Sequence, residues 1–163
     1  MTHIFVEFFS NFPPQVAVFL MSLTPFGELR LSIPVGLLRY HLPLEQVFII
    51  SVIGNMVPSI IILFFAGKFH KWIENKSGFF SKEWVNYLAK VQKKFKGKYQ
   101  KYGLAALILF VGIPLPMTGV WSGSVAAFIF GLPPKKAWPY ILVGVIISGT
   151  ITTIISLGLG KIF

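Results

Sequence analysis

The stretch Phe110–Gly123, FVGIPLPMTGVWSG, decides the fold because it places turn-forming residues inside apolar sequence. Backbone groups cannot hydrogen-bond to lipid, so non-helical chain at membrane depth persists only where it packs in protein or lines a wet cavity. We therefore predict the tip of a re-entrant hairpin, with Pro114 and Pro116 at its turn. An apolar arm leads in (104–111) and a second leads out (120–130). Each arm would span about 16 Å as a helix, roughly half of a ~30 Å hydrocarbon core.

The composition is that of an integral membrane protein. Hydrophobic residues make up 55% of the 163 residues and charged residues only 12%, and the mean hydropathy is +0.74. We expect one all-α membrane domain over residues 1–163. The chain has no cysteine, which excludes disulfides and thiolate catalysis. The Met1–His3 start lacks the basic region of a signal peptide, so we expect the first apolar run to be retained.

The net charge of +10 is concentrated, because most of the 15 basic residues lie between Lys68 and Lys101. The positive-inside rule places such a segment in the cytoplasm, so we expect no nucleic-acid partner. Apolar residues at 4-3-4-4 spacing predict an amphipathic helix within 68–101. It would lie on the membrane surface and attract anionic lipid, or equally pack on the protein as a solvated helix. Its apolar face would be Trp84, Leu88, Val91, Phe95 and Tyr99.

Two clean apolar runs, Leu44–Ala66 and Ala137–Leu159, are each long enough to cross a membrane, at about 34 Å of helix. If residues 103–131 crossed once, Lys135 and Lys136 would lie outside, against the charge rule. A re-entrant return keeps these lysines in the cytoplasm. We therefore expect a multi-pass protein of the plasma membrane with both termini outside.

The two halves of the chain match at an offset of about 91 residues. Pro25 falls on Pro116, and Gly54 falls close to Gly144. Each half reads as a hairpin followed by a transmembrane helix, and the charge rule gives the halves opposite orientations. Inverted repeats whose broken helices meet at mid-membrane are typical of transporters. The predicted repeats cover residues 4–67 and 103–160.

The first break in the apolar sequence carries the charges. Glu28 and Arg30 lie there between Pro25 and Gly27 on one side and Pro34 on the other. An ionisable residue at membrane depth costs free energy, and it usually pairs and faces a cavity. Burial and a neighbouring guanidinium push the pKa of a carboxyl in opposite directions, so Glu28 could exchange a proton near neutral pH. The alternative is a static Glu28–Arg30 ion pair that pins the turn.

The second break offers hydroxyls, open backbone and an indole instead. Thr118 or Ser122 could cap the helix that follows Gly119. Trp121 could stack on a flat substrate or simply pack. In the first break, Ser32 with Pro34 at the first helical position would play the same capping role.

Both outgoing helices would then point their N-termini at the bilayer centre. Helix N-termini favour anions, so with Arg30 the site would take an anionic or phosphate-bearing group, and Glu28 would be the proton partner. A cation site with Glu28 as its charge competes with this interpretation. Asn55, in the first span, would pack in the core or reach the cavity.

No catalytic or metal-binding pattern stands out. His3, His41 and His70 lie far apart near segment ends, and no nucleophile–base pair or phosphate loop is present. We expect no enzymatic activity, no metal and no cofactor.

Three motifs carry a family resemblance: GELRLSIPVG (27–36), GNMVP (54–58) and IPLPMTGVWSG (113–123). They resemble the signature segments of the putative small multidrug export family, although Met117 stands where that family usually has glycine. The architecture is similar to that of the DedA (VTT) membrane proteins. That resemblance implies facing re-entrant hairpins, use of the proton-motive force, and translocation of lipid or undecaprenyl phosphate. Glu28 matches the acid of the DedA first hairpin, but the arginines around the DedA second hairpin have no counterpart here.

These observations predict a proton-coupled membrane transporter. Its substrate would be a small amphipathic or anionic, phosphate-bearing molecule or a lipid, bound between the two hairpins. The alternative is a non-transporting scaffold or assembly factor that acts through its basic helix. A chain with two clean spans often needs a second copy, so a homo-oligomer stays open.

Overall fold

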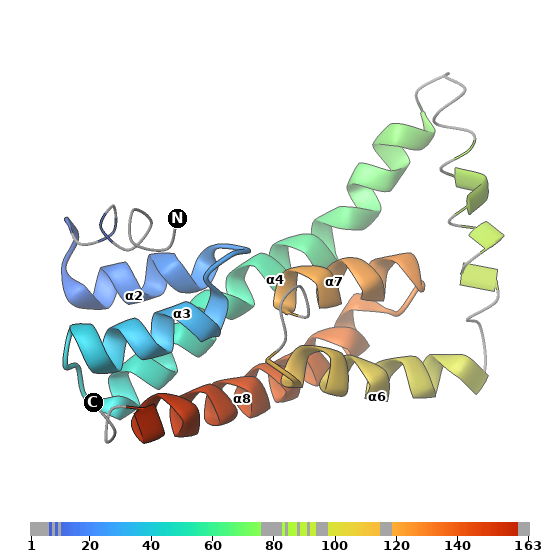
Figure 1. The fold of residues 1–163 in the computed structure, drawn as a ribbon. Coiled ribbons are helices and arrows are strands. Elements are labelled where there is room, and N and C mark those ends of the chain that lie inside the picture. The colour runs from blue at the N-terminus through green and yellow to red at the C-terminus, as the bar shows by residue number, and fades with distance from the viewer. Residues whose placement is uncertain are drawn as a thin grey trace.

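The computed structural model describes residues 7, 9, 11–75, 83, 85–87, 89–90, 92–93, 98–114 and 119–159. Within these residues the chain is helical and contains no strand (Figure 1). The elements are α2 (Pro14–Leu23), α3 (Glu28–Pro34), the π-helical η1 (Val35–Arg39), α4 (Leu44–Glu74), α6 (Lys98–Gly112), α7 (Val120–Ile129) and α8 (Pro134–Leu159).

Helices α4 and α8 are the two longest elements and the two candidate membrane spans. By length and composition, Leu44–Trp72 and Pro134–Gly158 could each cross a membrane. The helices contact one another and run in opposite directions (Figure 1). The two predicted spans are thus confirmed as long apolar helices, but both extend further toward the basic segment. Lysines at a helix end can keep their ammonium groups in water, and proline is well tolerated in a first helical turn.

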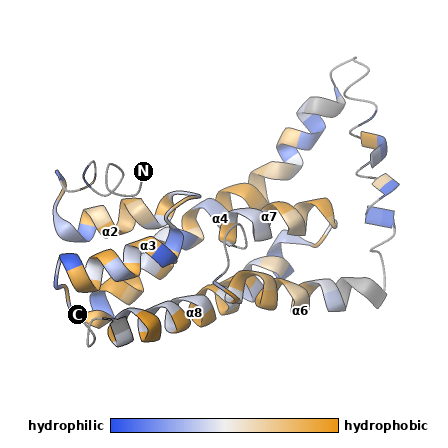
Figure 2. Ribbon diagram, in the orientation of Figure 1, coloured by the Kyte–Doolittle hydropathy of each residue, from blue (hydrophilic) through white to orange (hydrophobic). Residues whose placement is uncertain are grey.

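The outer surfaces of the two long helices are apolar. Large side chains such as Ile53 on α4 and Ile154 on α8 are more than half exposed. Figure 2 shows hydrophobic colour along both helices, with hydrophilic colour gathered toward the far end of α4 and in the turns. An apolar surface of this extent favours a lipid environment.

Four shorter helices form two pairs. Helices α2 and α3 make one antiparallel pair and α6 and α7 the other, and the α2–α3 turn lies on the side where α6 ends and α7 begins (Figure 1). Helices α2 and α7 have 10 residues each, or about 15 Å, half the thickness of a hydrocarbon core. The arms predicted around the second break lie in α6 and α7 and are helices, as expected.

The outgoing helix of the first pair starts earlier than predicted. We expected it to begin at Pro34, but α3 begins at Glu28 and Pro34 is its last residue. The backbone N–H of Glu28 already donates to the carbonyl of Thr24 at 3.1 Å, which starts the helix six residues sooner. Proline lacks an N–H and its ring disturbs the preceding turn, and the chain widens after it into η1, where Tyr40 N–H donates to the Val35 carbonyl at 3.1 Å.

Ser32 does not cap a helix, because its hydroxyl bonds across to α4. Ser32 Oγ donates to Ser51 Oγ at 2.9 Å, and Ser124 Oγ of α7 donates to Ser59 Oγ at 2.9 Å. Helix α4 thus holds one outgoing helix from each pair by a buried hydroxyl contact, a common device in membrane bundles.

Three hydroxyls of α8 hydrogen-bond within their own helix. Thr150 donates to the carbonyl of Ile146, and Thr153 to that of Gly149, both at 2.8 Å within α8. These bonds satisfy the two hydroxyls without a partner on a neighbouring helix.

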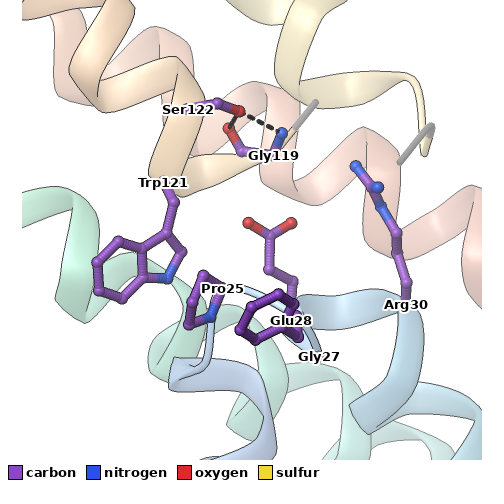
Figure 3. A pocket seen from close by; sticks show the side chains of 8 residues that line it. Pro25, Gly27, Glu28, Arg30, Gly119, Trp121 and Ser122 are labelled. Carbon is purple, nitrogen blue, oxygen red and sulfur yellow. Dashed lines mark hydrogen bonds between the residues drawn. The ribbon is translucent and has the colours of Figure 1, made fainter. Parts of the chain in front are cut away.

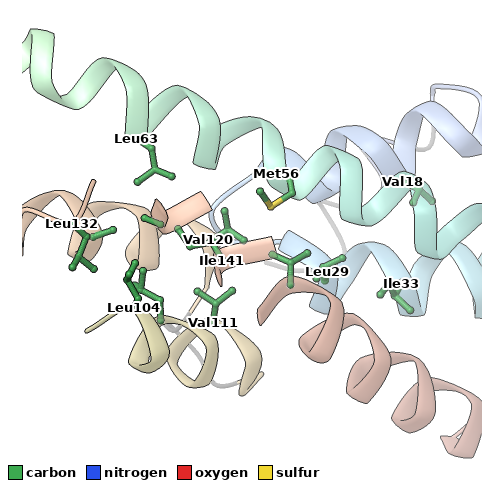
Figure 4. Packing of buried hydrophobic residues seen from close by; sticks show 14 of the residues in the cluster. Val18, Leu29, Ile33, Met56, Leu63, Leu104, Val111, Val120, Leu132 and Ile141 are labelled. Carbon is green, nitrogen blue, oxygen red and sulfur yellow. The ribbon is translucent and has the colours of Figure 1, made fainter. Parts of the chain in front are cut away.

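The core connects both pairs through the long helices. Figure 4 shows Leu29 of α3, Met56 of α4, Val111 of α6, Val120 of α7 and Ile141 of α8 in one buried cluster. Members of both halves share this cluster, so the two pairs of helices pack around one core.

The contacts between helices come in matched sets. Helix α2 packs on α4 as α6 packs on α8, α3 reaches α8 as α7 reaches α4, and α3–α4 corresponds to α7–α8. A Cβ at Gly54 would lie 3.0 Å from the Phe19 carbonyl of α2, and one at Gly144 would lie 3.1 Å from the Ile108 carbonyl of α6. In each half, a glycine lets the first arm approach the backbone of its own long helix.

Most of the predicted amphipathic face lies outside the described residues. This applies to Trp84, Leu88, Val91 and Phe95. Gln92 is described, and its Nε2 donates to the Phe128 carbonyl at 3.4 Å. The basic segment therefore contacts the end of α7.

A candidate site between the two hairpin tips

A cavity of about 390 Å³ lies where the turns of the two helix pairs meet (Figure 3). It brings together seven of the residues singled out from the sequence. They are Pro25, Gly27, Glu28 and Arg30 from the first break and Gly119, Trp121 and Ser122 from the second. Residues about 90 positions apart thus share one small volume, and the N-termini of both α3 and α7 face it.

Thr24 organises the first turn. Its hydroxyl donates to the Met21 carbonyl at 2.8 Å and accepts the Gly27 N–H at 3.1 Å. These bonds close the turn at the end of α2, and Glu28 follows as the first residue of α3. Thr24 was not among the predicted site residues, although threonine before a proline is a recognisable turn signal.

Glu28 adopts a strained backbone conformation. Its φ of 45° lies in the left-handed region, which glutamate seldom occupies. The residue is only 7% exposed. Such strain persists only when the surrounding structure fixes it, and it tends to occur at functional sites.

The second turn presents its backbone to the cavity. Gly119 precedes α7 in an extended conformation, and its N–H donates to Ser122 Oγ at 3.0 Å. The expected capping role of Ser122 takes this form: its hydroxyl accepts the N–H of the residue before the helix. Thr118, the other capping candidate, lies outside the described residues.

The first backbone N–H groups of α7 bind a side chain of the first hairpin. The backbone N–H groups of Val120 and Trp121 donate to the Glu28 carboxylate. A Cβ at Gly119 would overlap that carboxylate, so glycine is what lets it approach. A negative charge at a helix N-terminus is favourable. An anionic group was expected at the N-terminus of α7, and the group found there is a side chain of the protein itself.

Arg30 supplies the positive charge of the cavity. Its guanidinium lies on the opposite side of the Glu28 carboxylate from Trp121 (Figure 3), and the two charges attract one another. The cavity therefore brings together a carboxylate, a guanidinium and the N-terminus of α7. Such a set can bind a proton at one group and an anion at the others.

Trp121 ties the two turns together. Its indole Nε1–H donates to the Leu23 carbonyl, the last residue of α2, at 3.1 Å. The indole also lines the cavity. The hydrogen bond favours the packing role over free stacking, because it fixes the ring.

Three groups of predicted residues lie elsewhere. Asn55 is buried in α4, at 2% exposure, and does not occur among the described residues that line the cavity. Pro34 ends α3, one helix length away from the turn. Pro114 is described just beyond α6, whereas Pro116 is outside the described residues. In the described part of the chain no three His, Cys, Asp or Glu residues form a metal-binding group.

Comparison with known proteins gives one match. The family model described as putative small multi-drug export protein matches residues 28–151. The match begins at Glu28 and extends through α3, α4, α6 and α7 into α8. No curated protein and no solved structure matches the chain.

Proposed function

The chain belongs to the putative small multi-drug export family, and from this premise we propose that it is a proton-coupled transporter whose substrate site is the cavity between the hairpin tips. The substrate class that the cavity suits is a small amphipathic molecule with an anionic group. Glu28 carries the proton, and Arg30 with the N-terminus of α7 receives the anionic group.

The observation that carries the proposal is the Glu28 carboxylate on the N–H groups of α7. A carboxylate and a substrate anion compete for the same donors. When Glu28 is protonated it becomes a weak acceptor, which frees the donors and leaves Arg30 without its negative neighbour. The proton and the anionic group then bind to the same state of the protein, so that movement of one is coupled to movement of the other.

The proposed membrane arrangement is two inverted repeats, each a re-entrant hairpin followed by a spanning helix. The matched contacts of α2–α4 with α6–α8, and of α3–α8 with α7–α4, support it. So does the antiparallel course of α4 and α8 (Figure 1). In such a fold one repeat can rock against the other around a fixed site and expose the site to each side in turn.

The test uses the purified chain in proteoliposomes with an imposed pH gradient and a trapped pH-sensitive dye. Short-chain phosphatidic acid and a set of anionic dyes serve as substrate probes. We expect Glu28→Gln to lower probe-dependent proton flux at least tenfold, because glutamine cannot change charge. Glu28→Asp should lose a similar amount, because its carboxylate no longer reaches α7. Glu45→Gln, an exposed acid at the start of α4, is the control and should keep wild-type flux.

Unchanged proton flux in Glu28→Gln would refute the coupling role. Suppose that Glu28→Gln also fully complemented a deletion strain, whereas a variant lacking segment 68–101 did not. The protein would then act as a scaffold and not as a transporter.

A further inference from the structure

A second cavity, of about 300 Å³, lies at the other end of the molecule, where the basic segment meets the turn between α7 and α8. Its walls are Leu63, Phe64 and Gly67 of α4, Gln92, Phe128 and residues 131–134. It shares no residue with the cavity at the hairpin tips. The cavity joins α4 of one half to the start of α8 in the other.

The walls of this cavity are apolar apart from Gln92. Leu63 and Leu132 form its buried part, at 3% exposure each, and Phe64 is 45% exposed. The Gln92 amide already donates to the Phe128 carbonyl. A peptide backbone would find few hydrogen-bond partners here, whereas a hydrocarbon chain needs none. The exposed apolar surface of α4 adjoins the opening.

Lysines follow the wall residues closely in the sequence. Lys68 comes directly after Gly67, Lys93 directly after Gln92, and Lys135 directly after Pro134. All three side chains are exposed, as are Lys71, Lys90 and Lys136. Positive charge next to the bilayer attracts anionic headgroups, and the attraction grows with each basic residue near the surface.

Aromatic residues place this end of α4 at the membrane surface. Phe69 stacks on Trp72 with ring centroids 5.8 Å apart, and Lys68 Nζ lies 5.1 Å from the centre of the Phe65 ring. Tryptophan and lysine together at a helix end are typical of the headgroup level.

We propose that this cavity binds one anionic phospholipid of the cytoplasmic leaflet. Its phosphate lies among the lysines, and the first part of an acyl chain lies against Leu63, Phe64 and Leu132. The lipid contacts α4, the α7–α8 turn and Gln92 together, so its binding stabilises the fold and holds the basic segment in place. This site is separate from substrate transport at the hairpin tips.

The experiment measures thermal unfolding of the full chain in detergent with added phosphatidylglycerol or phosphatidylcholine. At about a hundredfold excess over the dissociation constant, we expect phosphatidylglycerol to raise the midpoint by roughly 5 °C. Phosphatidylcholine should raise it by less than a third of that. Native mass spectrometry should show one retained phosphatidylglycerol per chain.

Two variants locate the site. A Cβ at Gly67 meets nothing within 4 Å, so Gly67→Leu can fill the cavity without a backbone clash. In this variant we expect phosphatidylglycerol no longer to raise the unfolding midpoint, and we expect no lipid to be retained in native mass spectrometry. Gly158→Leu is the matched control, since Gly158 also has open space and lies at the far end of α8. The double variant Lys135→Gln/Lys136→Gln should weaken phosphatidylglycerol binding about fivefold or more and leave the lipid-free midpoint unchanged.

The following results would overturn the proposal. A full phosphatidylglycerol shift in Gly67→Leu would place the lipid elsewhere. Equal shifts with phosphatidylcholine would remove the role of charge. An equal shift with inorganic phosphate alone would make this a simple anion site. If Gly67→Leu does not fold, a wild-type response of the double lysine variant still refutes the site.

Discussion

At the tip of the first hairpin the chain places a carboxylate and a guanidinium, whereas the tip of the second offers backbone N–H groups and an indole. The first tip joins helices of 10 and 7 residues and the second joins helices of 15 and 10, and the two pairs make corresponding contacts with the long helices. The difference is that Glu28 crosses to the second tip and occupies its donors. Equivalent positions in the two halves therefore hold complementary chemistry, and neither tip would be satisfied without the other.

The strongest way to break this complementarity is Gly119→Ala. The new Cβ would overlap the Glu28 carboxylate and push it off the N–H groups of Val120 and Trp121. A buried carboxylate without its donors costs about 2–3 kcal/mol. We expect proton-linked transport to fall as far as in Glu28→Gln, and the unfolding midpoint to drop by several degrees. Proteoliposome flux and thermal unfolding in detergent measure the two effects.

The control for Gly119→Ala is Gly103→Ala. Its Cβ would make an ordinary contact with Leu132 at 3.5 Å, so both readouts should stay near wild type. Wild-type flux in Gly119→Ala would show that the position of the carboxylate on α7 has no functional role.

A second prediction tests whether the two halves share similar side-chain packing as well as a similar arrangement of helices. Gly54→Ala crowds the Ser22 side chain and the Phe19 carbonyl, and Gly144→Ala crowds Val111 at 2.8 Å. Overpacking of this kind costs about 1–3 kcal/mol. We expect the two variants to lower the unfolding midpoint by similar amounts. Gly158→Ala, which meets nothing within 4 Å, should be neutral or slightly stabilising.

A large loss in Gly54→Ala with none in Gly144→Ala would contradict equivalent packing. The matched contacts would then reflect a similar arrangement of helices without similar packing. This result would weaken the inverted-repeat arrangement that we propose.

The sequence predicted the helices and the position of the site better than the details of either turn. Long apolar runs identify α4 and α8, because length and hydropathy alone determine whether a helix can span. The prolines and glycines of the two breaks correctly mark the two turns that meet. The start of α3 was predicted wrongly because Pro34 is an equally good signal for a helix start and for a helix irregularity. Only the path of the backbone separates these two possibilities.

The contact between Glu28 and α7 could not be read from the sequence either. It depends on how far two turns about 90 residues apart approach, and that distance is determined by packing on α4 and α8. The location of Asn55 likewise depends on how the helices pack. Its position in the first span left core packing and the cavity both open, and the residue is buried in α4.

The smallest expected effect follows from removing the uncharged hydrogen bond between the two tips. Trp121→Phe keeps most of the ring and removes the Nε1–H that donates to the Leu23 carbonyl. A neutral hydrogen bond contributes about 1 kcal/mol, so we expect a fall of a few degrees in the unfolding midpoint. If the ring mainly fixes the two turns, substrate-linked proton flux should fall only about twofold. A much larger loss of flux with an unchanged midpoint would instead assign Trp121 to direct substrate contact, and would make the second tip an equal contributor to recognition.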